Sequence, residues 1–318
     1  MEIEMQNQYF SYRDKCPACN SNIFKELYQK PYDEPPISEY LKSFYSSQGG
    51  VEFKYLKNAN FILCACKECG LIFQKEIPND LLMKILYEKW LDAKKLFEQR
   101  QKTDDLCVYS QYAQEILTII AYLRQVPSEL SFFDFGMGWG KWALMAKGFG
   151  CKSYGTDLSE ERIKYASSNG IKVIAWNEIP KHSFNFINTE QVFEHIPNPL
   201  DTLIYLKDAL KTDGMLKISV PTANDIKRRL KLMDWKAPKS SRNSLNPVAP
   251  LEHINCFRRN SLIKMAAIAG MEEVVIPMRI QYAYTSNWYG GKRIAKNILL
   301  PIYRNILKRQ NYLFFRNK

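Results

Sequence analysis

One stretch of the sequence indicates how the chain folds: Phe132-Phe133-Asp134-Phe135-Gly136-Met137-Gly138-Trp139-Gly140-Lys141. An apolar run typical of a buried strand ends in three glycines at alternate positions, and a helix-forming segment follows at once. Glycine lets the backbone come close to a ligand at the carboxyl end of the first strand of a parallel sheet. The G-x-G-x-G spacing differs from the G-x-G-x-x-G spacing that binds a dinucleotide pyrophosphate.

An acidic residue at the end of the next predicted strand strengthens this interpretation. Residues 153–156 read as a strand, and Asp157 follows it, 17 residues after Gly140. A carboxylate at the tip of the second strand can accept hydrogen bonds from both hydroxyls of a ribose. A glycine loop alone indicates only a tight turn, whereas strand, loop, helix, strand and acid in this order indicate a ligand site.

Short apolar runs alternate with helical patterns through the middle and the last third of the chain. The predicted strands span residues 131–135, 153–156, 172–175, 184–188, 215–220, 273–277 and 280–284. The predicted helices span residues 109–124, 141–148, 160–168, 200–210, 225–232 and 259–269. Such alternation predicts an α/β domain with a parallel sheet that helices cover on both faces.

The glycine loop and its acidic partner resemble motifs I and II of class I S-adenosylmethionine-dependent methyltransferases. The resemblance spans residues 109–277 and includes Gln191-Val192-Phe193-Glu194-His195-Ile196-Pro197, Leu210-Lys211-Thr212-Asp213-Gly214 and Leu251-Glu252-His253. It implies a doubly wound, Rossmann-like methyltransferase sheet of strand order 3-2-1-4-5-7-6 and a bound S-adenosyl-L-methionine. The residues that it places around this methyl donor are Asp134, Gly136, Gly138, Gly140, Asp157, Leu158, Asn177, Glu190 and Gln191.

Four of the eight cysteines form two C-x-x-C pairs, Cys16 with Cys19 and Cys66 with Cys69, and 46 residues lie between Cys19 and Cys66. Two such knuckles supply four thiolates, which structural zinc (Zn2+) prefers in a tetrahedral site. We therefore expect a small zinc-ribbon-like module, with Cys64 as an alternative ligand. Free thiols or a redox-active pair are the other interpretations, but a redox site needs only one C-x-x-C motif.

Two C-x-x-C pairs ahead of this fold resemble the sugar methyltransferases of deoxysugar and surface-glycan pathways. The resemblance implies a sugar acceptor, either nucleotide-linked or part of a surface glycan, and a base that removes its proton. The chain has only three histidines, so the candidate bases are His195, after the fourth strand, and His253, in a predicted lid segment. His182 precedes a strand at the opposite end of the domain and is expected to be an ordinary surface residue.

A catalytic metal is the other interpretation of the same histidines. Some methyltransferases hold a divalent metal with an E-x-x-E-H run and a later histidine. Here Gln191 stands where the run begins with a carboxylate, which weakens a site for a hard cation. The sequence therefore favours a histidine base.

The net charge of +12 is concentrated in the last third of the 318 residues. Residues 226–318 contain 19 Lys or Arg and 4 Asp or Glu, a net of +15, so residues 1–225 carry 26 basic and 29 acidic residues, a net of −3. Residues 292–318 mix basic and apolar side chains as amphipathic helices on a membrane surface do. Because basic surfaces also attract nucleic acid, an RNA methyltransferase that binds RNA through its zinc module is the alternative function.

The predicted organisation has four parts. They are a zinc module at residues 1–78, linking helices at 79–126, a donor-binding domain at 127–285 and a basic amphipathic tail at 286–318. No apolar run is long enough to cross a membrane, and the acidic N-terminus does not read as a secretory signal. We therefore expect a cytoplasmic enzyme whose tail either contacts the inner face of the membrane, packs on the domain or pairs with a second subunit.

Overall fold

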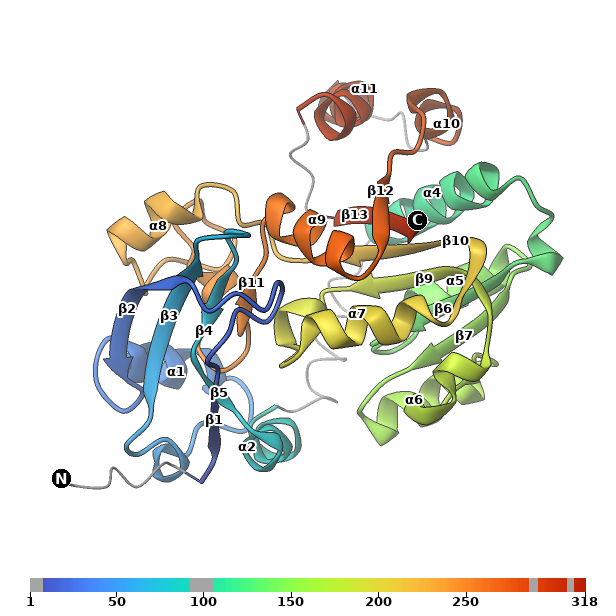
Figure 1. Ribbon diagram of the computed structural model, residues 1–318. Coiled ribbons are helices and arrows are strands. Elements are labelled where there is room, and N and C mark those ends of the chain that lie inside the picture. Colours follow the sequence, from blue (N-terminus) through green and yellow to red (C-terminus); the bar gives the residue numbers. More distant parts are fainter. Residues whose placement is uncertain (1–7, 92–105, 286–290, 308–311) are drawn as a thin grey trace. The chain divides into compact units, whose positions relative to one another are not determined.

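The computed structural model describes residues 8–91, 106–285, 291–307 and 312–318, which form two compact units (Figure 1). The first unit comprises residues 1–103, 194–199 and 221–261, and the second comprises residues 104–193, 200–220 and 262–318. Neither unit is therefore one continuous piece of the sequence.

The first unit contains two antiparallel sheets and short helices. One sheet pairs β1 (Phe10–Tyr12) with β5 (Glu76–Pro78). The other has the order β11-β4-β3-β2, in which the strands are β11 (Asn255–Cys256), β4 (Ile72–Gln74), β3 (Asn60–Cys66) and β2 (Phe24–Pro31). The helices are α1 (Ile37–Tyr45), η1 (Phe53–Tyr55), α2 (Asp80–Ile85), η2 (Leu86–Trp90), α8 (Ile226–Leu232) and η6 (Asn246–Val248), and η5 (Phe193–His195) begins at its boundary.

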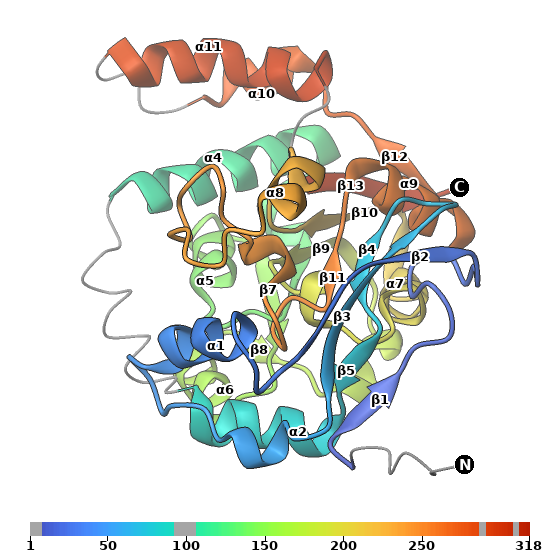
Figure 2. The same ribbon diagram turned by 90° about the vertical axis from the view of Figure 1, so that its left-hand side faces the viewer.

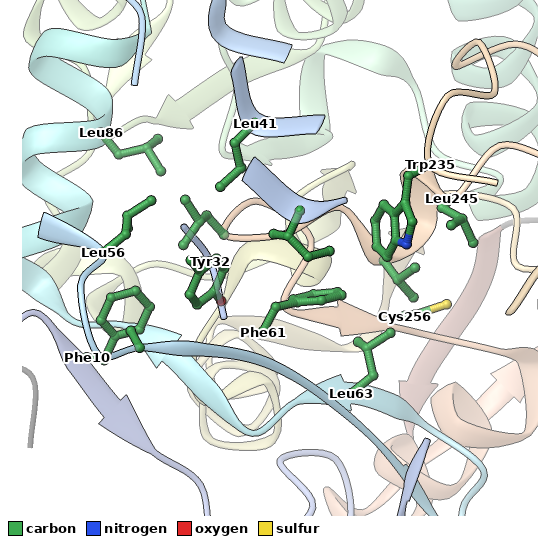
Figure 3. Close-up of a cluster of buried hydrophobic side chains, with 14 of the residues drawn as sticks. Phe10, Tyr32, Leu41, Leu56, Phe61, Leu63, Leu86, Trp235, Leu245 and Cys256 are labelled. Atoms are coloured by element: carbon green, nitrogen blue, oxygen red, sulfur yellow. The ribbon is translucent and has the colours of Figure 1, made fainter. Parts of the chain in front are cut away.

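An aromatic core explains why residues 221–261 belong to this unit (Figure 3). The Trp235 ring lies edge-on to that of Phe61 in β3, with 5.5 Å between ring centroids. It also contacts Tyr28 of β2 and Tyr40 of α1 at 5.9 and 5.4 Å. Large aromatic rings dominate the energetics of a core, so this cluster ties the inserted segment to the N-terminal residues.

The second unit is built on one seven-stranded sheet of order β12-β13-β10-β9-β6-β7-β8. The strands are β6 (Ser131–Phe135), β7 (Lys152–Thr156), β8 (Lys172–Val173), β9 (Phe184–Glu190), β10 (Leu210–Ser219), β12 (Met271–Val274) and β13 (Tyr312–Asn317). β13 runs antiparallel to both of its neighbours, and the other pairs are parallel. Numbered along the chain, this order is 3-2-1-4-5-7-6, which confirms the predicted topology.

Helices lie on both faces of this sheet (Figures 1 and 2). They are α4 (Leu106–Leu123), α5 (Lys141–Gly148), α6 (Glu160–Ser168), α7 (Pro199–Lys207) and α9 (Arg259–Ile268), with the short η3 (Pro127–Glu129) and η4 (Trp176–Lys181). The helices α10 (Met278–Ala283) and α11 (Gly291–Asn305) lie beyond α4, which α10 contacts (Figure 2). On one face Ile119 of α4 and Trp142 of α5 pack against Phe132 and Phe186 of the sheet. Figure 1 shows α7 and α9 on the other face. Among the described residues, no helix is both long and apolar enough to cross a bilayer.

The last strand lies where a helical tail was expected. The prediction of a strand at residues 280–284 was wrong, because this segment forms α10, in which the buried Gln281 side chain donates to the Ile276 carbonyl at 2.7 Å. The seventh strand is β13, whose Leu313 and Phe315 are 1% and 0% exposed. Its partners β10 and β12 are distant in sequence, so local patterns gave no sign of the pairing.

Candidate active site

The glycine loop between β6 and α5 has an unusual backbone. Gly136, Gly138 and Gly140 all have left-handed φ angles, of 72°, 56° and 72°, which side chains rarely tolerate. A Cβ at Gly136 would lie 2.6 Å from Cγ2 of Val192, and one at Gly140 would lie 2.6 Å from Cδ1 of Ile171. A Cβ at Gly138 would meet no atom within 4 Å. The absence of a side chain at Gly136 and Gly140 therefore lets Val192 and Ile171 pack against the loop, whereas Gly138 faces open space.

Asp157, just after β7, accepts a hydrogen bond from this loop. Its Oδ2 accepts from the backbone N–H of Gly138 at 2.9 Å, and its Oδ1 accepts from the N–H of Ser159 at 3.0 Å. Arg162 adds a longer contact of 3.5 Å to Oδ1. Because each carboxylate oxygen has two lone pairs, the fixed carboxylate can still accept from a ligand. The adjacent Leu158 is 89% exposed.

Asp134 lies behind the loop. It is 3% exposed, and its Oδ1 accepts from Nδ2 of Asn188 at 2.8 Å. Burial raises the pKa of Asp134 to about 7, although the hydrogen bond from Asn188 acts to lower it. Its position suits support of the loop and gives it no direct path to a ligand.

Glu190 and Gln191 mark the carboxyl end of β9. One oxygen of Glu190 lies 2.6 Å from Nζ of Lys217, and the other accepts from the Ser219 hydroxyl at 3.0 Å. Gln191 has a φ of 56°, and its N–H donates to the Ser219 carbonyl at 2.9 Å. Two side chains of β10 thus hold the Glu190 carboxylate in a fixed position, with the Glu190 side chain 37% exposed.

An exposed aromatic platform follows β8. Asn177 is exposed on η4, and its neighbour Trp176 stacks on Tyr205 of α7, with ring centroids 4.8 Å apart and an angle of 8° between the planes. Trp176 also lies 5.5 Å from the ring of Phe135, the last residue of β6. An exposed, stacked tryptophan provides a flat surface for a planar ligand.

The two predicted bases meet in the first unit. The rings of His195 and His253 lie edge to face, with centroids 4.9 Å apart. Nδ1 of His195 contacts the carbonyl of Glu252 at 2.7 Å, and Nδ1 of His253 contacts the carbonyl of Asn246. Burial lowers the pKa of both imidazoles, that of His253 to about 3 with a further contribution from His195. Both are therefore neutral at physiological pH.

The sequence of the chain matches the model of a known protein family. The family model described as a methyltransferase domain matches residues 106–275, more than half of the chain. The chain belongs to the methyltransferase domain family. Its sheet order and glycine loop are those of a class I S-adenosylmethionine-dependent methyltransferase. No curated protein matches the chain in sequence.

Several solved structures are similar to this methyltransferase. A putative sarcosine dimethylglycine methyltransferase from Galdieria sulphuraria is 15% identical, with a TM-score of 0.41 over 65% of this chain and 86% of that one. The plantazolicin methyltransferase BpumL in complex with SAH is 14% identical, with a TM-score of 0.47 over 74% and 94%. A ribosomal protein L11 methylase from Lactobacillus delbrueckii subsp. bulgaricus is 18% identical, with a TM-score of 0.32 over 50% and 69%. The family assignment rests on the match to residues 106–275 and not on these likenesses.

The four cysteines of the paired motifs converge in the methyltransferase's first unit. Sγ of Cys16 lies 3.6 Å from that of Cys69, and Sγ of Cys19 lies 3.5 Å from that of Cys66. All four sulfur atoms lie within 4.8 Å of one another. Tetrahedral zinc with Zn–S bonds of about 2.3 Å separates its sulfur ligands by about 3.8 Å, so the cluster fits this metal. Cys64 is not part of the cluster.

The two cysteine knuckles share one backbone pattern. The N–H of Cys16 donates to the carbonyl of Ser21 at 2.8 Å, and that of Asn20 donates back to Cys16 at 2.9 Å. The second knuckle repeats these two bonds between Cys66 and Leu71 at 2.9 Å and between Gly70 and Cys66 at 3.1 Å. Asn20 and Gly70 have φ angles of 58° and 75°. Asn20 is therefore the counterpart of Gly70, as its tolerance of left-handed conformations allows.

Two buried basic residues of this methyltransferase, Lys217 and Arg13, were not predicted as part of a site. Lys217 contacts Glu190, and its signal was a lysine within the otherwise apolar strand at residues 215–220. Arg13 is buried and donates to the carbonyls of Ile196 and Pro197 at 3.4 and 2.6 Å. Nothing local to Arg13 indicates a partner more than 180 residues away.

Proposed function

We propose that the methyltransferase binds S-adenosyl-L-methionine at the glycine loop and transfers its methyl group to a small-molecule acceptor by in-line displacement. The observation that carries the proposal is the hydrogen bond from the N–H of Gly138 to the Asp157 carboxylate. It holds this carboxylate beside the open space at Gly138. In this proposal Asp157 accepts from the ribose hydroxyls of the donor. Gly136, Gly138 and Gly140 let the backbone approach its methionine part.

Neighbouring residues complete the proposed donor site. Leu158 and Asn177 are exposed after β7 and β8, where apolar contact and an amide suit the adenine. Glu190 ends β9 and Gln191 follows it, and a carboxylate suits the donor's ammonium group. Asp134, from its buried position, supports the loop.

For the acceptor we propose a sugar, nucleotide-linked or part of a surface glycan, with His195 or His253 as the base. Each imidazole has its Nδ1 occupied by a carbonyl, which leaves Nε2 to accept a proton. Along the chain, His195 follows Glu190 by only five residues. The alternative acceptor is RNA, bound through the cysteine module and the basic surface, and a steep salt dependence of affinity would identify it.

We also propose that Cys16, Cys19, Cys66 and Cys69 bind a structural zinc ion. Their four sulfur atoms lie within 4.8 Å of one another, as the ligands of one tetrahedral ion do. Four thiolates leave no coordination position for a substrate. The zinc would therefore stabilise the first unit and take no part in methyl transfer.

Calorimetry with S-adenosylhomocysteine tests donor binding. We expect one site, weakened at least about tenfold by Asp157→Ala, because a hydrogen bond to a charged group contributes about 1.5–3 kcal/mol. Asp213→Ala, at an exposed turn of β10, is the matched control and should bind as the wild type does. A folded wild-type protein that releases no heat would exclude the proposal.

The amphipathic helix α11 suggests where the enzyme works. Its exposed apolar side chains are Ile294, Ile298 and Leu299, which are 37%, 47% and 57% exposed, and Ile306 and Leu307 follow at 65% and 55%. Lys292 and Lys296 are exposed beside them, and residues 274–318 contain nine Lys or Arg and no Asp or Glu. The inner side of α11 packs on α10, where the Tyr282 hydroxyl donates to the Ile298 carbonyl at 2.7 Å.

We propose that this face of α11 lies on an anionic membrane surface, which places the cytoplasmic enzyme at the inner face of the membrane. Apolar side chains flanked by lysines match the interface between acyl chains and acidic headgroups. Sedimentation with phosphatidylglycerol vesicles should capture the wild type and release it at high salt, whereas phosphatidylcholine vesicles should not capture it. Ile298→Asp should abolish capture, and Ile268→Asp, at an equally exposed position on α9, should not. A wild type that stays in solution, or self-associates without vesicles, would contradict the proposal.

A further inference from the structure

A second group of metal-ligating side chains lies in the first unit, apart from the four cysteines. Ligand atoms of Glu194, His195 and His253 lie within 4.8 Å of one another. Nε2 of His195 is 3.9 Å from Oε1 of Glu194, whose side chain is only 1% exposed. Gln191, which stands where the metal-binding run of other methyltransferases begins with a carboxylate, is not a member of this cluster.

The hydrogen bonds of the two imidazoles determine which nitrogen atoms are able to bind a metal. A backbone carbonyl can only accept, so the Nδ1 atoms of His195 and His253 carry hydrogen toward Glu252 and Asn246. In a neutral imidazole the other nitrogen then bears a lone pair. Nε2 of each histidine is therefore a ligand atom whose ring is oriented from behind, as in metal sites with an ordered outer shell.

Electrostatics favours a cation at this place. Ligand atoms of two imidazoles and one carboxylate lie within 4.8 Å of one another, and the negative carboxylate and the nitrogen lone pairs would attract a cation bound among them. Two imidazoles and one carboxylate form the ligand set of transition-metal sites with open positions. Imidazole nitrogen disfavours calcium and magnesium, which prefer oxygen ligands.

The scaffold around the cluster is rigid. Arg13 donates to the carbonyls of Ile196 and Pro197, and Nδ2 of Asn255 also donates to Ile196 at 2.7 Å, so the segment after His195 is held from two sides. Nε2 of Gln74 donates to the His253 carbonyl at 3.0 Å. Ligand atoms about 3.0–3.5 Å apart surround a metal at bond lengths of about 2.1 Å, so small side-chain rotations would close the site.

We propose that Glu194, His195 and His253 bind one divalent transition-metal ion, of the zinc, manganese, iron or cobalt class, through one carboxylate and two Nε2 atoms. Three protein ligands leave coordination positions open, which suits binding of an acceptor oxygen. This site is an alternative to the histidine base: with both Nε2 atoms bound to the ion, neither imidazole could accept the acceptor's proton, and the ion would instead make a bound hydroxyl group more acidic. The proposed metal site does not depend on the proposed donor site, so metal binding can be tested without a methyl donor.

Metal counting tests the site directly. After loading with Zn2+ and removal of loosely bound metal, elemental analysis should give two ions per wild-type chain, one at the cysteines and one at the new site. His253→Ala and Glu194→Gln should each retain one ion. His182→Ala, which removes the only histidine outside the cluster, should retain two.

Cobalt spectroscopy separates the two sites without relying on a variant that folds. Co2+ titrated into zinc-loaded protein that lacks the second ion should give visible d–d bands without the thiolate-to-cobalt charge-transfer band of a cysteine site. Glu194→Gln retains the size of the side chain and should lose these bands, while its thermal melting shows whether it is folded. A wild type that holds a single ion at the cysteines, or variants that both retain two, would overturn the proposal.

Discussion

Nζ of Lys217 lies 2.6 Å from Oε2 of Glu190, and the lysine side chain is only 1% exposed. The same ammonium group lies 2.7 and 2.9 Å from the two carboxylate oxygens of Glu115 in α4. Burial lowers the pKa of Lys217, but the two carboxylates raise it by more, so the net pKa shift is upward. One buried cation thus fixes the carboxylate that we place next to the methyl donor.

Replacing this cation should destabilise the second unit. Lys217→Met would leave two carboxylates without their charged partner, and we expect a loss of about 3 kcal/mol, the lower end of the range for a broken buried pair, because water can reach the half-buried Glu190. Urea unfolding measures this. Lys164→Met removes an exposed ion pair to Glu160 of 3.8 Å and should cost less than about 1 kcal/mol. Equal losses in the two variants would contradict the assigned role.

The glycine loop should separate stability from donor binding. Gly140→Ala would bring a Cβ to 2.6 Å from Ile171, so we expect it to lower the free energy of unfolding by about 2 kcal/mol through overpacking and left-handed strain. Gly138→Ala meets no atom and should cost about 1 kcal/mol. Its new methyl group would nevertheless occupy the open space proposed for the donor. Calorimetry should therefore show the larger loss of S-adenosylhomocysteine affinity in Gly138→Ala, and unchanged affinity would exclude donor contact at this glycine.

The local backbone of the proposed donor site could be predicted from the sequence. The left-handed backbone at positions 136, 138 and 140 favours glycine, which the sequence has at all three. Asp157 is the residue directly after β7, as predicted. The strand order followed from the family resemblance. The cysteine cluster was predictable because paired spacing fixes each knuckle within four residues.

Long-range contacts account for what could not be predicted. β13 is recognisable as a strand only through its pairing with β10 and β12. Residues 221–261 join the N-terminal residues through Trp235 and its aromatic neighbours, which no local pattern indicates. The convergence of Glu194 with His253, almost 60 residues apart, likewise depends on the folded first unit.

The cysteine cluster allows a matched pair of variants. Cys69→Ser removes a proposed zinc ligand, and we expect loss of the thiolate-bound ion and unfolding of the first unit at lower temperature, because zinc binding contributes directly to folding. Cys64→Ser changes a buried cysteine two residues from Cys66 and outside the cluster, so zinc should remain. Elemental analysis and thermal melting measure both effects. Retention of this ion by Cys69→Ser would exclude the assignment.

Asp134 makes the stability of the second unit depend on pH. Burial raises its pKa from 3.8 to about 7 in the folded protein, so between these values the folded chain holds a proton that the unfolded chain releases. The stability contributed by the protonated carboxyl group is complete below about pH 4 and is lost as the pH rises through 7.

Asp134→Asn should remove this pH dependence, because the amide is neutral at every pH and keeps the shape of the side chain. Between about pH 5 and 7 we expect the wild type to lose stability relative to the variant by up to about 1.4 kcal/mol per pH unit, with no further divergence above pH 8. Urea unfolding at several pH values gives the difference, in which the other titrating groups cancel. Parallel curves would show that Asp134 is ionised in the folded protein, and the hydrogen bond from Asn188 would then outweigh its burial.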